Sequence, residues 1–385
     1  MKGTVMRSSF LPYFIPSISD EEIRSVTETL SSNWLTTGPK VHEFEQAFAR
    51  TVGARHAIAV NSCTAALHLG LVLSGIKPGD EVITTPLTFC ATVNVIIHTG
   101  AVPVLADIDP ITGCLSPHAV RSVITEKTKA IIPVHFAGTP YDIDTLHALA
   151  HDHALAVIDD AAHALPTYYK NRIIGSFGNP TAFSFYVTKN ITTGEGGMLV
   201  VNDDNAAHYA RILTLHGISA DAWKRYHQAG SWRYDVECAG FKYNMMDIQA
   251  ALGLQQLRKL DSFQQRRSAI AARYTSALAS LPLILPVEIP ETKTSWHLYV
   301  IRLKPDAPLS RNTLIDALKK RNIGTGVHFI PLHHHSFYQN SFGWKIGDFP
   351  NCDSFYSAAL SLPLYPAMTD DDVQDVIDAL YDIIV

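Results

Sequence analysis

Apolar and polar positions in the middle of this chain form blocks typical of alternating strands and helices. Short apolar runs have the length and composition of buried strands, and they lie at residues 56–60, 81–85, 102–106, 130–135, 155–159, 181–186 and 198–202. Segments with helical spacing separate them, at about 63–74, 89–99, 116–125, 142–153 and 204–216. Strands separated by helices form βαβ units, so the pattern predicts an α/β fold with a mainly parallel sheet.

Two helices are expected before this block. Ser19 and Glu22 form a capping box, which opens a helix that ends near Ser31. Its apolar positions fall at helical spacing: Ile23, Val26 and Leu30. Pro39 begins a second helix, since proline is favoured in a first helical turn.

The chain after the block has the pattern of a smaller α+β domain. One long helical pattern runs from residue 246 to about 281 and stops at a proline-rich stretch. A strand at 296–303, a helix at 310–320, a strand through 324–329 and a closing helix after Thr369 follow. A chain of 385 residues is long for one core. We therefore expect a large domain at residues 1–250, which includes the N-terminal segment, and a smaller C-terminal domain at 251–385.

Composition narrows the possible functions. Hydrophobic residues make up 47% of the chain and the net charge is −5, which describes a globular protein and gives no indication of nucleic-acid binding. No apolar run approaches the roughly 18 residues of a membrane span. The five cysteines are scattered without C-x-x-C spacing, which favours reduced thiols in the cytoplasm. No carboxylate or cysteine lies at ligand spacing from the histidines at 328 and 333–335, so no metal site is predicted.

The strongest candidate chemistry lies at the ends of two predicted strands. Lys189 follows the apolar run of TAFSFYVTKNITTGEGG, and a glycine-rich turn comes next. Taken alone, such a lysine is more often a surface residue. However, the strand at 155–159 delivers Asp159 and Asp160, followed by His163. Ligands of open α/β sheets bind at the carboxyl ends of strands, and a Schiff-base lysine with an aspartate at a pyridinium nitrogen is typical of pyridoxal phosphate (PLP) enzymes.

A second candidate is the turn between the first predicted strand and its helix, which reads NSCTAAL. It places Cys63 and Thr64 at a helix N-terminus, where free N–H groups and the helix dipole favour an anion. An ordinary helix N-cap would have the same composition. Neither G-x-G-x-x-G nor G-x-x-x-x-G-K-[ST] occurs at a strand–helix turn, which disfavours dehydrogenases and NTPases.

Several stretches together resemble a known family. They are NWLTTGPKVHEFE (33–45), NSCTAALHL (61–69), GDEVITTPLTF (79–89), AIIPVHFAG (130–138), IDDAAHA (158–164), FSFYVTKNITTGEGG (183–197), FKYNMMDIQAALGL (241–254), IGTGVHFIPLH (323–333) and SLPLYP (361–366). In these the chain resembles the DegT-type (DegT/DnrJ/StrS) PLP-dependent sugar aminotransferases, of the aspartate aminotransferase-like fold type I. It is most similar to members that make UDP-4-amino-4-deoxy-L-arabinose.

The resemblance implies a set of cofactor-binding residues. Lys189 would be the catalytic residue and would carry PLP, Asp160 would pair with the ring nitrogen, and Phe89 and His163 would lie against the ring. The phosphate would contact the Cys63 backbone, Thr64 and Ser184, together with Asn244 of the neighbouring subunit. Cys63 departs from relatives, which often have glycine or alanine there.

The same resemblance suggests four substrate contacts. Thr36 and Thr37 lie in a loop expected near the sugar, and Arg233 lies in a long polar loop at 216–244 that is expected at the active site near a dimer interface. His328 belongs to the HFIPLH stretch at the expected substrate mouth, where Phe329 replaces a tyrosine.

The implied function is transamination of a nucleotide-linked keto sugar, expected to be a UDP-4-keto sugar, with glutamate as donor and 2-oxoglutarate as its product. The enzyme would be a cytoplasmic homodimer with shared active sites, and its pathway would be amino-sugar or surface polysaccharide biosynthesis, such as that of lipopolysaccharide. Alternatives are a PLP-dependent sugar dehydratase, an amino-acid aminotransferase of the same fold, and a regulatory protein that retains the fold. Lys189 disfavours the dehydratase, because histidine replaces the lysine in those relatives.

Overall fold

A computed structural model describes residues 7–218 and 233–385. Its main sheet contains strands from the predicted block: β1 (His56–Val60), β2 (Glu81–Thr84), β3 (Val102–Leu105), β4 (Thr128–Ile132), β5 (Ala156–Val157), β6 (Asp159–Asp160), β9 (Thr181–Ser184) and β10 (Gly197–Val201). Their bounds differ from the predicted ones by at most three residues. Residues 219–232 of the predicted active-site loop, with Trp223 to Trp232, lie outside the described residues.

One short strand joins the two halves of this sheet. The halves have the orders β3-β2-β4-β5 and β1-β10-β9-β6, and β5 and β6 follow each other across Ile158. The Ile158 N–H donates to the carbonyl of Ile131 (3.0 Å), and the Asp159 N–H donates to that of Pro180 (2.9 Å). Neighbouring strands are parallel except at β10, which is antiparallel to β9 and β1. The predicted α/β fold with a mainly parallel sheet is confirmed.

Helices cover both faces of the sheet. One face packs against α3 (Cys63–Leu73), α4 (Ala91–His98) and α7 (Asp204–Thr214), and the other against α2 (Pro39–Thr51), α5 (Pro117–Val123), α6 (Ile143–Asp152) and α9 (Asp247–Arg258). Strand β10 is buried throughout because Met198 and Val200 enter one core while Leu199 and Val201 enter the other. A strand covered on both faces is therefore apolar at consecutive positions.

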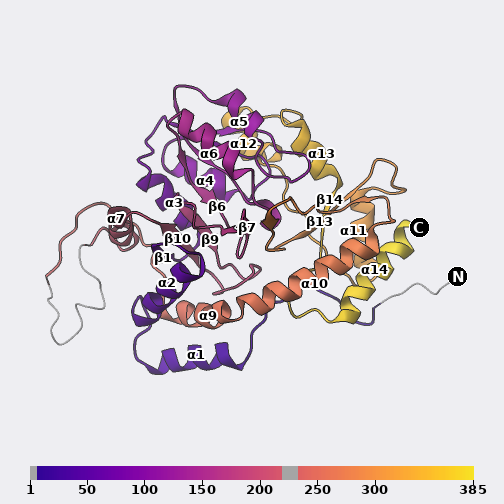
Figure 1. The fold of residues 1–385 in the computed structure, drawn as a ribbon, viewed down its shortest axis with the longest axis horizontal. Coiled ribbons are helices and arrows are strands. Elements are labelled where there is room, and N and C mark those ends of the chain that lie inside the picture. The colour runs from indigo at the N-terminus through magenta and orange to yellow at the C-terminus, as the bar shows by residue number, and fades with distance from the viewer. Residues whose placement is uncertain (1–6, 219–232) are drawn as a thin grey trace.

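The C-terminal part has its own core. An antiparallel sheet of β11 (Leu283–Ile284), β13 (Tyr299–Leu303) and β14 (Ala359–Leu362) packs with α10 (Leu260–Leu278), α11 (Arg311–Lys320) and α14 (Asp370–Ile384). Figure 1 shows α9 and α10 running nearly end to end, from α1 (Asp20–Ser31) and α2 at one side to α11 and α14 at the other. Leu11 of the N-terminal segment also belongs to this core. The domain boundary after residue 250 stays a prediction.

Shorter elements complete the described chain: β7 (Tyr168–Tyr169), β8 (Arg172–Ile173), β12 (Thr292–Lys293), α12 (Ser336–Phe342), α13 (Pro350–Ala358) and the 3₁₀ turns η1 (Phe136–Gly138) and η2 (Leu332–His334). In the part of the chain that the structure describes, no helix is both long and apolar enough to cross a membrane.

Two predicted elements of the C-terminal part are wrong. The helix expected over 246–281 is divided at Lys259, whose amine reaches Glu22 of α1 at 2.8 Å. The strand expected through 324–329 is absent apart from one bridge between Gly326 and Ser361. A side chain at Gly324 would come within 2.8 Å of the Tyr13 backbone nitrogen. The N-terminal segment therefore occupies the space beside this stretch.

Helix α1 (Asp20–Ser31) has an unexpected orientation. Its polar residues Glu22, Ser25 and Thr29 are buried, and the Ser25 hydroxyl donates to the carbonyl of Ala251 in α9 (3.2 Å). Its apolar residues face outward, and the exposed fractions of Ile23 and Leu30 are 59% and 52%. The capping box of Ser19 and Glu22 forms as predicted.

Candidate active site

A cavity of about 590 Å³ opens at the carboxyl ends of the central strands. Its lining includes most of the residues expected to bind the cofactor, and one expected to bind substrate: Cys63, Thr64, Phe89, Asp160, His163, Ser184, Lys189 and His328. This volume is within the usual range for a cofactor or small-molecule site. Residues from three strand ends, the start of α3 and the C-terminal part thus meet in one space.

Lys189 reaches this cavity because the chain turns sharply after β9. The Lys189 N–H donates to the carbonyl of Tyr186 (2.9 Å), and the Thr193 N–H donates to the carbonyl of Phe185 (2.9 Å). The side chain is partly accessible through the cavity but surrounded by protein. This burial lowers the pKa of the Lys189 amine to about 8, although Cys63 and Asp160 act to raise it. A larger fraction of this amine than of an exposed lysine is therefore neutral and nucleophilic near neutral pH.

The two adjacent aspartates have different surroundings. Asp160 lines the cavity, and its carboxylate accepts hydrogen bonds from the Thr92 hydroxyl (2.8 Å) and the Ala162 N–H (3.1 Å). Burial raises the pKa of Asp160, while these hydrogen bonds and the charge of Lys189 oppose the rise. Asp159 points away into the core, where it accepts a hydrogen bond from the Tyr141 hydroxyl (2.6 Å). Only Asp160 is therefore placed to meet a ligand in the cavity.

His163 presents a neutral ring to the cavity. Burial, and then the charges of Lys189 and His328, hold the pKa of His163 well below its usual value. Its Nδ1 accepts a hydrogen bond from the Ala137 N–H (3.3 Å), so Nε2 carries the proton. The ring stacks on Phe329 with centroids 5.8 Å apart, and His297 lies behind it at 4.3 Å.

The start of α3 provides a place for an anion. Ser62 caps the helix by accepting a hydrogen bond from the Ala65 N–H (3.1 Å), and Cys63 and Thr64 form the first turn beside the cavity. A side chain at Gly197 would lie 2.5 Å from the carbonyl carbon of Ser62. Glycine at this position therefore lets β10 approach the helix N-terminus, where N–H groups and the dipole attract phosphate.

The remaining predicted residues lie outside this cavity. Asn244 donates a hydrogen bond from Nδ2 to the Thr37 hydroxyl (2.7 Å), and both line a separate hollow. The carbonyl of Thr36 accepts from the Asp247 N–H (3.2 Å). Arg233 is exposed, at the edge of the described residues. None of these four residues lines the cavity of its own chain.

Sequence reasoning missed several residues of the cavity wall. Thr92 holds Asp160 from α4, His297 comes from the segment before β13, and Tyr13 comes from the N-terminal segment. Thr92 could have been considered, because it follows GDEVITTPLTF by only three residues. Tyr13 and His297 carried no local signal, since only the tertiary fold brings them to this place.

Comparisons with known proteins agree with this site. The DegT/DnrJ/EryC1/StrS aminotransferase family model matches residues 16–381. The spore coat polysaccharide biosynthesis protein SpsC of Bacillus subtilis (strain 168) is 55% identical over 381 residues, which are 98% of each chain. The PLP-form structure of Spr1654 from Streptococcus pneumoniae is 33% identical with a TM-score of 0.91, covering 98% of this chain and 100% of that one. PseC of Helicobacter pylori, an aminotransferase involved in the biosynthesis of pseudoaminic acid, is 30% identical with a TM-score of 0.90, covering 97% and 99%.

The residues present fit the cofactor that this family uses. The cavity offers a buried amine at Lys189, a carboxylate at Asp160, a flat neutral ring at His163 and a helix N-terminus for a phosphate. These are the groups that a protein supplies to PLP. The predicted fold type I, the PLP cofactor and the family resemblance are thus confirmed. The chain belongs to the DegT/DnrJ/EryC1/StrS aminotransferase family.

Proposed function

We propose that this aminotransferase moves an amino group from glutamate to a keto sugar linked to a nucleotide diphosphate, with a UDP-4-keto sugar as the expected acceptor. The product would enter amino-sugar or surface polysaccharide biosynthesis in the cytoplasm. SpsC and PseC, named for the biosynthesis of spore coat polysaccharide and of pseudoaminic acid, support this direction. The position of the keto group stays a prediction from the resemblance.

The observation that carries the proposal is a second hollow beside the cofactor cavity. It has a volume of about 630 Å³ and shares Thr88, Phe89 and Phe329 with that cavity. The two together offer more volume than an amino acid needs. The shared aromatic rings provide apolar surface on which a sugar or a base can pack.

The described residues that line the cavity include no arginine. An amino-acid aminotransferase of this fold typically uses an arginine to select the α-carboxylate, so these walls show no preference for amino acids as the main substrate. Lys189 lies in the cavity, where a dehydratase of the family would have histidine. The assembled set of Lys189, Asp160, Thr64 and Ser184 disfavours a purely regulatory protein.

Each residue has a defined task in this mechanism. PLP supplies an electron sink for the charge that develops when the donor Cα loses its proton. Lys189 provides a neutral amine, first as the nucleophile that holds the cofactor and then as the base that takes the Cα proton. Asp160 would place a carboxylate beside the ring nitrogen, which would strengthen that sink. His163 would present its neutral ring to the cofactor.

We further propose that two chains form a homodimer with shared active sites. Thr37 and Asn244 lie together outside the cavity of their own chain. This is the position expected of residues that contribute to the active site of a neighbouring chain. Leu35 and Met246, each within two residues of this pair in the sequence, are exposed apolar residues (43% and 44%), and Ile23 and Leu30 of α1 are exposed as well. Burying such a surface against a second copy would give the favourable free energy that the monomer leaves unused.

The substrate is tested by running the reaction in reverse. Nucleotide-linked amino sugars that differ in base and in amino position are incubated with the enzyme and 2-oxoglutarate, and glutamate formation is measured. We expect a UDP-linked 4-amino sugar to give the highest kcat/KM. Turnover with free amino acids and none with any nucleotide sugar would contradict the proposal.

The two aspartates provide a matched pair of variants. Asp160→Asn removes the charge beside the cofactor ring and should lower kcat by about 10²–10³-fold with little change in Tm. Asp159→Asn weakens a buried contact with Tyr141, so it should lower Tm and change kcat by less than about tenfold. Steady-state kinetics and thermal unfolding measure both. If Asp159→Asn gave the large loss of kcat and Asp160→Asn gave the loss of Tm, Asp159 and not Asp160 would be the partner of the cofactor.

Hybrid dimers test the shared site. A Lys189→Ala chain and an Asn244→Glu chain should each be inactive, the second because a carboxylate would face the neighbouring chain's phosphate. A mixed dimer has one site with both residues intact, so co-expression with two different affinity tags should restore activity. Mixed dimers without activity, or a monomeric wild-type enzyme at assay concentration, would show that each site is built within one chain.

A further inference from the structure

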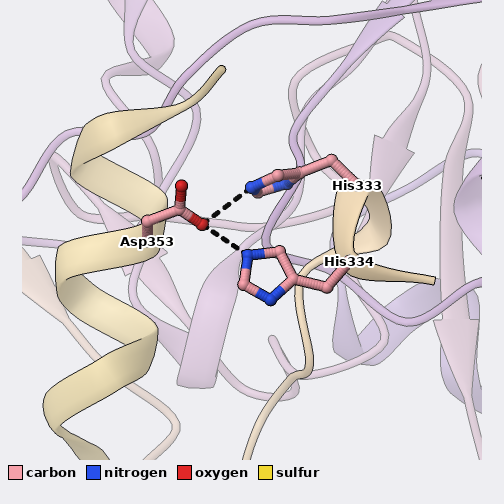
Figure 2. A group of neighbouring side chains, drawn as sticks. All are labelled: His333, His334 and Asp353. Atoms are coloured by element: carbon pink, nitrogen blue, oxygen red, sulfur yellow. Dashed lines mark hydrogen bonds and ion pairs between the residues drawn. The ribbon is translucent and has the colours of Figure 1, made fainter. Parts of the chain in front are cut away.

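Two consecutive histidines converge on one carboxylate away from the cofactor cavity. Figure 2 shows His333 and His334 of η2 pointing toward Asp353 of α13. Their Nε2 atoms lie 2.7 and 2.6 Å from the same oxygen, Oδ1 of Asp353. One ligand atom from each residue lies within 4.8 Å of the other two. The sequence predicted no metal because no carboxylate was at ligand spacing, but the fold brings one from 20 residues downstream.

The charge of Asp353 is not balanced by a formal cation among the described residues. Its only ion-pair contacts there are the two imidazoles, and no lysine or arginine pairs with it. Imidazole nitrogens and carboxylate oxygens are ligands that divalent transition-metal ions accept. A carboxylate that meets two imidazoles and no lysine or arginine is therefore an environment that a divalent cation would stabilise.

The surroundings hold these three groups in place. The Gly347 N–H donates to Oδ2 of Asp353 (2.8 Å), which leaves Oδ1 directed at the histidines. The Gln339 amide donates to the His333 carbonyl (2.9 Å), and the Leu332 N–H donates to the carbonyl of Pro86 (3.0 Å). Such supporting hydrogen bonds orient the ligands of protein metal sites.

We propose that His333, His334 and Asp353 bind one divalent transition-metal ion of the zinc class, with solvent completing its coordination. A tetrahedral ion about 2.0–2.2 Å from each ligand would separate the ligand atoms by about 3.3 Å. The present contacts of 2.7 and 2.6 Å would have to open by about 0.6 Å. The His334 side chain can turn because it lies at the surface, 17% exposed.

The site is structural rather than catalytic, since none of the three residues lines the cofactor cavity. It fixes η2, which follows the segment that carries His328 and Phe329 into that cavity. Nδ1 of His333 has no hydrogen-bond partner in the described structure. A missing outer partner typically reduces metal affinity about 10–100-fold, so we expect micromolar rather than nanomolar binding.

The test uses the full-length enzyme loaded with PLP, treated with EDTA and desalted. Zinc is titrated in competition with a chromophoric chelator, and thermal unfolding is followed with and without zinc. We expect one zinc per chain and a higher Tm, with cobalt giving the intense visible bands of a tetrahedral ion. His334→Gln and Asp353→Asn should each weaken binding at least tenfold. His335→Gln, the next residue in the same run, should bind zinc as the wild type does.

Absence of stoichiometric zinc binding by the wild type would overturn the proposal, leaving the cluster a hydrogen-bonded contact between η2 and α13. Unchanged affinity in His334→Gln would overturn it as well, and this variant decides the matter if Asp353→Asn fails to fold. The visible absorption of the bound cofactor provides a further control. A spectral change on zinc addition that persists in His334→Gln would place the metal at the bound cofactor and overturn the proposal.

Discussion

The active site depends on the pairing of one five-residue strand segment with two neighbours. On one side of residues 156–160, Ile158 and Asp160 donate backbone hydrogen bonds to the carbonyls at positions 131 and 133, at the end of β4 and just after it. On the other side, Asp159 and the next residue donate to the carbonyls at positions 180 and 182, just before β9 and within it. This pairing fixes Asp160 at the carboxyl edge of the sheet beside the turn that carries Lys189. Because one strand serves both halves of the sheet, a shift of register there would also exchange Asp159 and Asp160 between core and cavity.

The rest of the cavity is closed by segments that are distant in the sequence. Arg267 of α10 is buried, and its guanidinium donates to the carbonyls of Trp296 (3.1 Å) and Leu364 (3.0 Å). These two segments place His297 and Leu364 in the cavity wall. The orientation of the C-terminal part is thus coupled to the shape of the cofactor site by one buried cation and the carbonyls around it.

The sequence predicted what local pattern determines. Strands buried on both faces are continuous apolar runs, and the polar residues at their ends are candidates to meet a ligand. This is how Lys189 and the pair of Asp159 and Asp160 could be found, while the choice of Asp160 came from the family resemblance. The sequence could not predict contacts that only the tertiary fold creates. Glu22 and Ser25 face the protein because α9 offers them partners, and Thr29 is buried on the same side, so the apolar side of α1 faces outward. Asp353 contacts His333 and His334 for the same reason. Neither contact produces a periodic pattern of residues in the sequence.

The central claim is that the buried amine of Lys189 carries the cofactor, and its covalent attachment tests this most directly. The purified enzyme with PLP is reduced with borohydride, digested and mapped by mass spectrometry, beside Lys189→Ala treated in the same way. The account predicts one modified peptide, with the phosphopyridoxyl group on Lys189, and no modified peptide in the variant. A label on another lysine, or full turnover by Lys189→Ala, would contradict it.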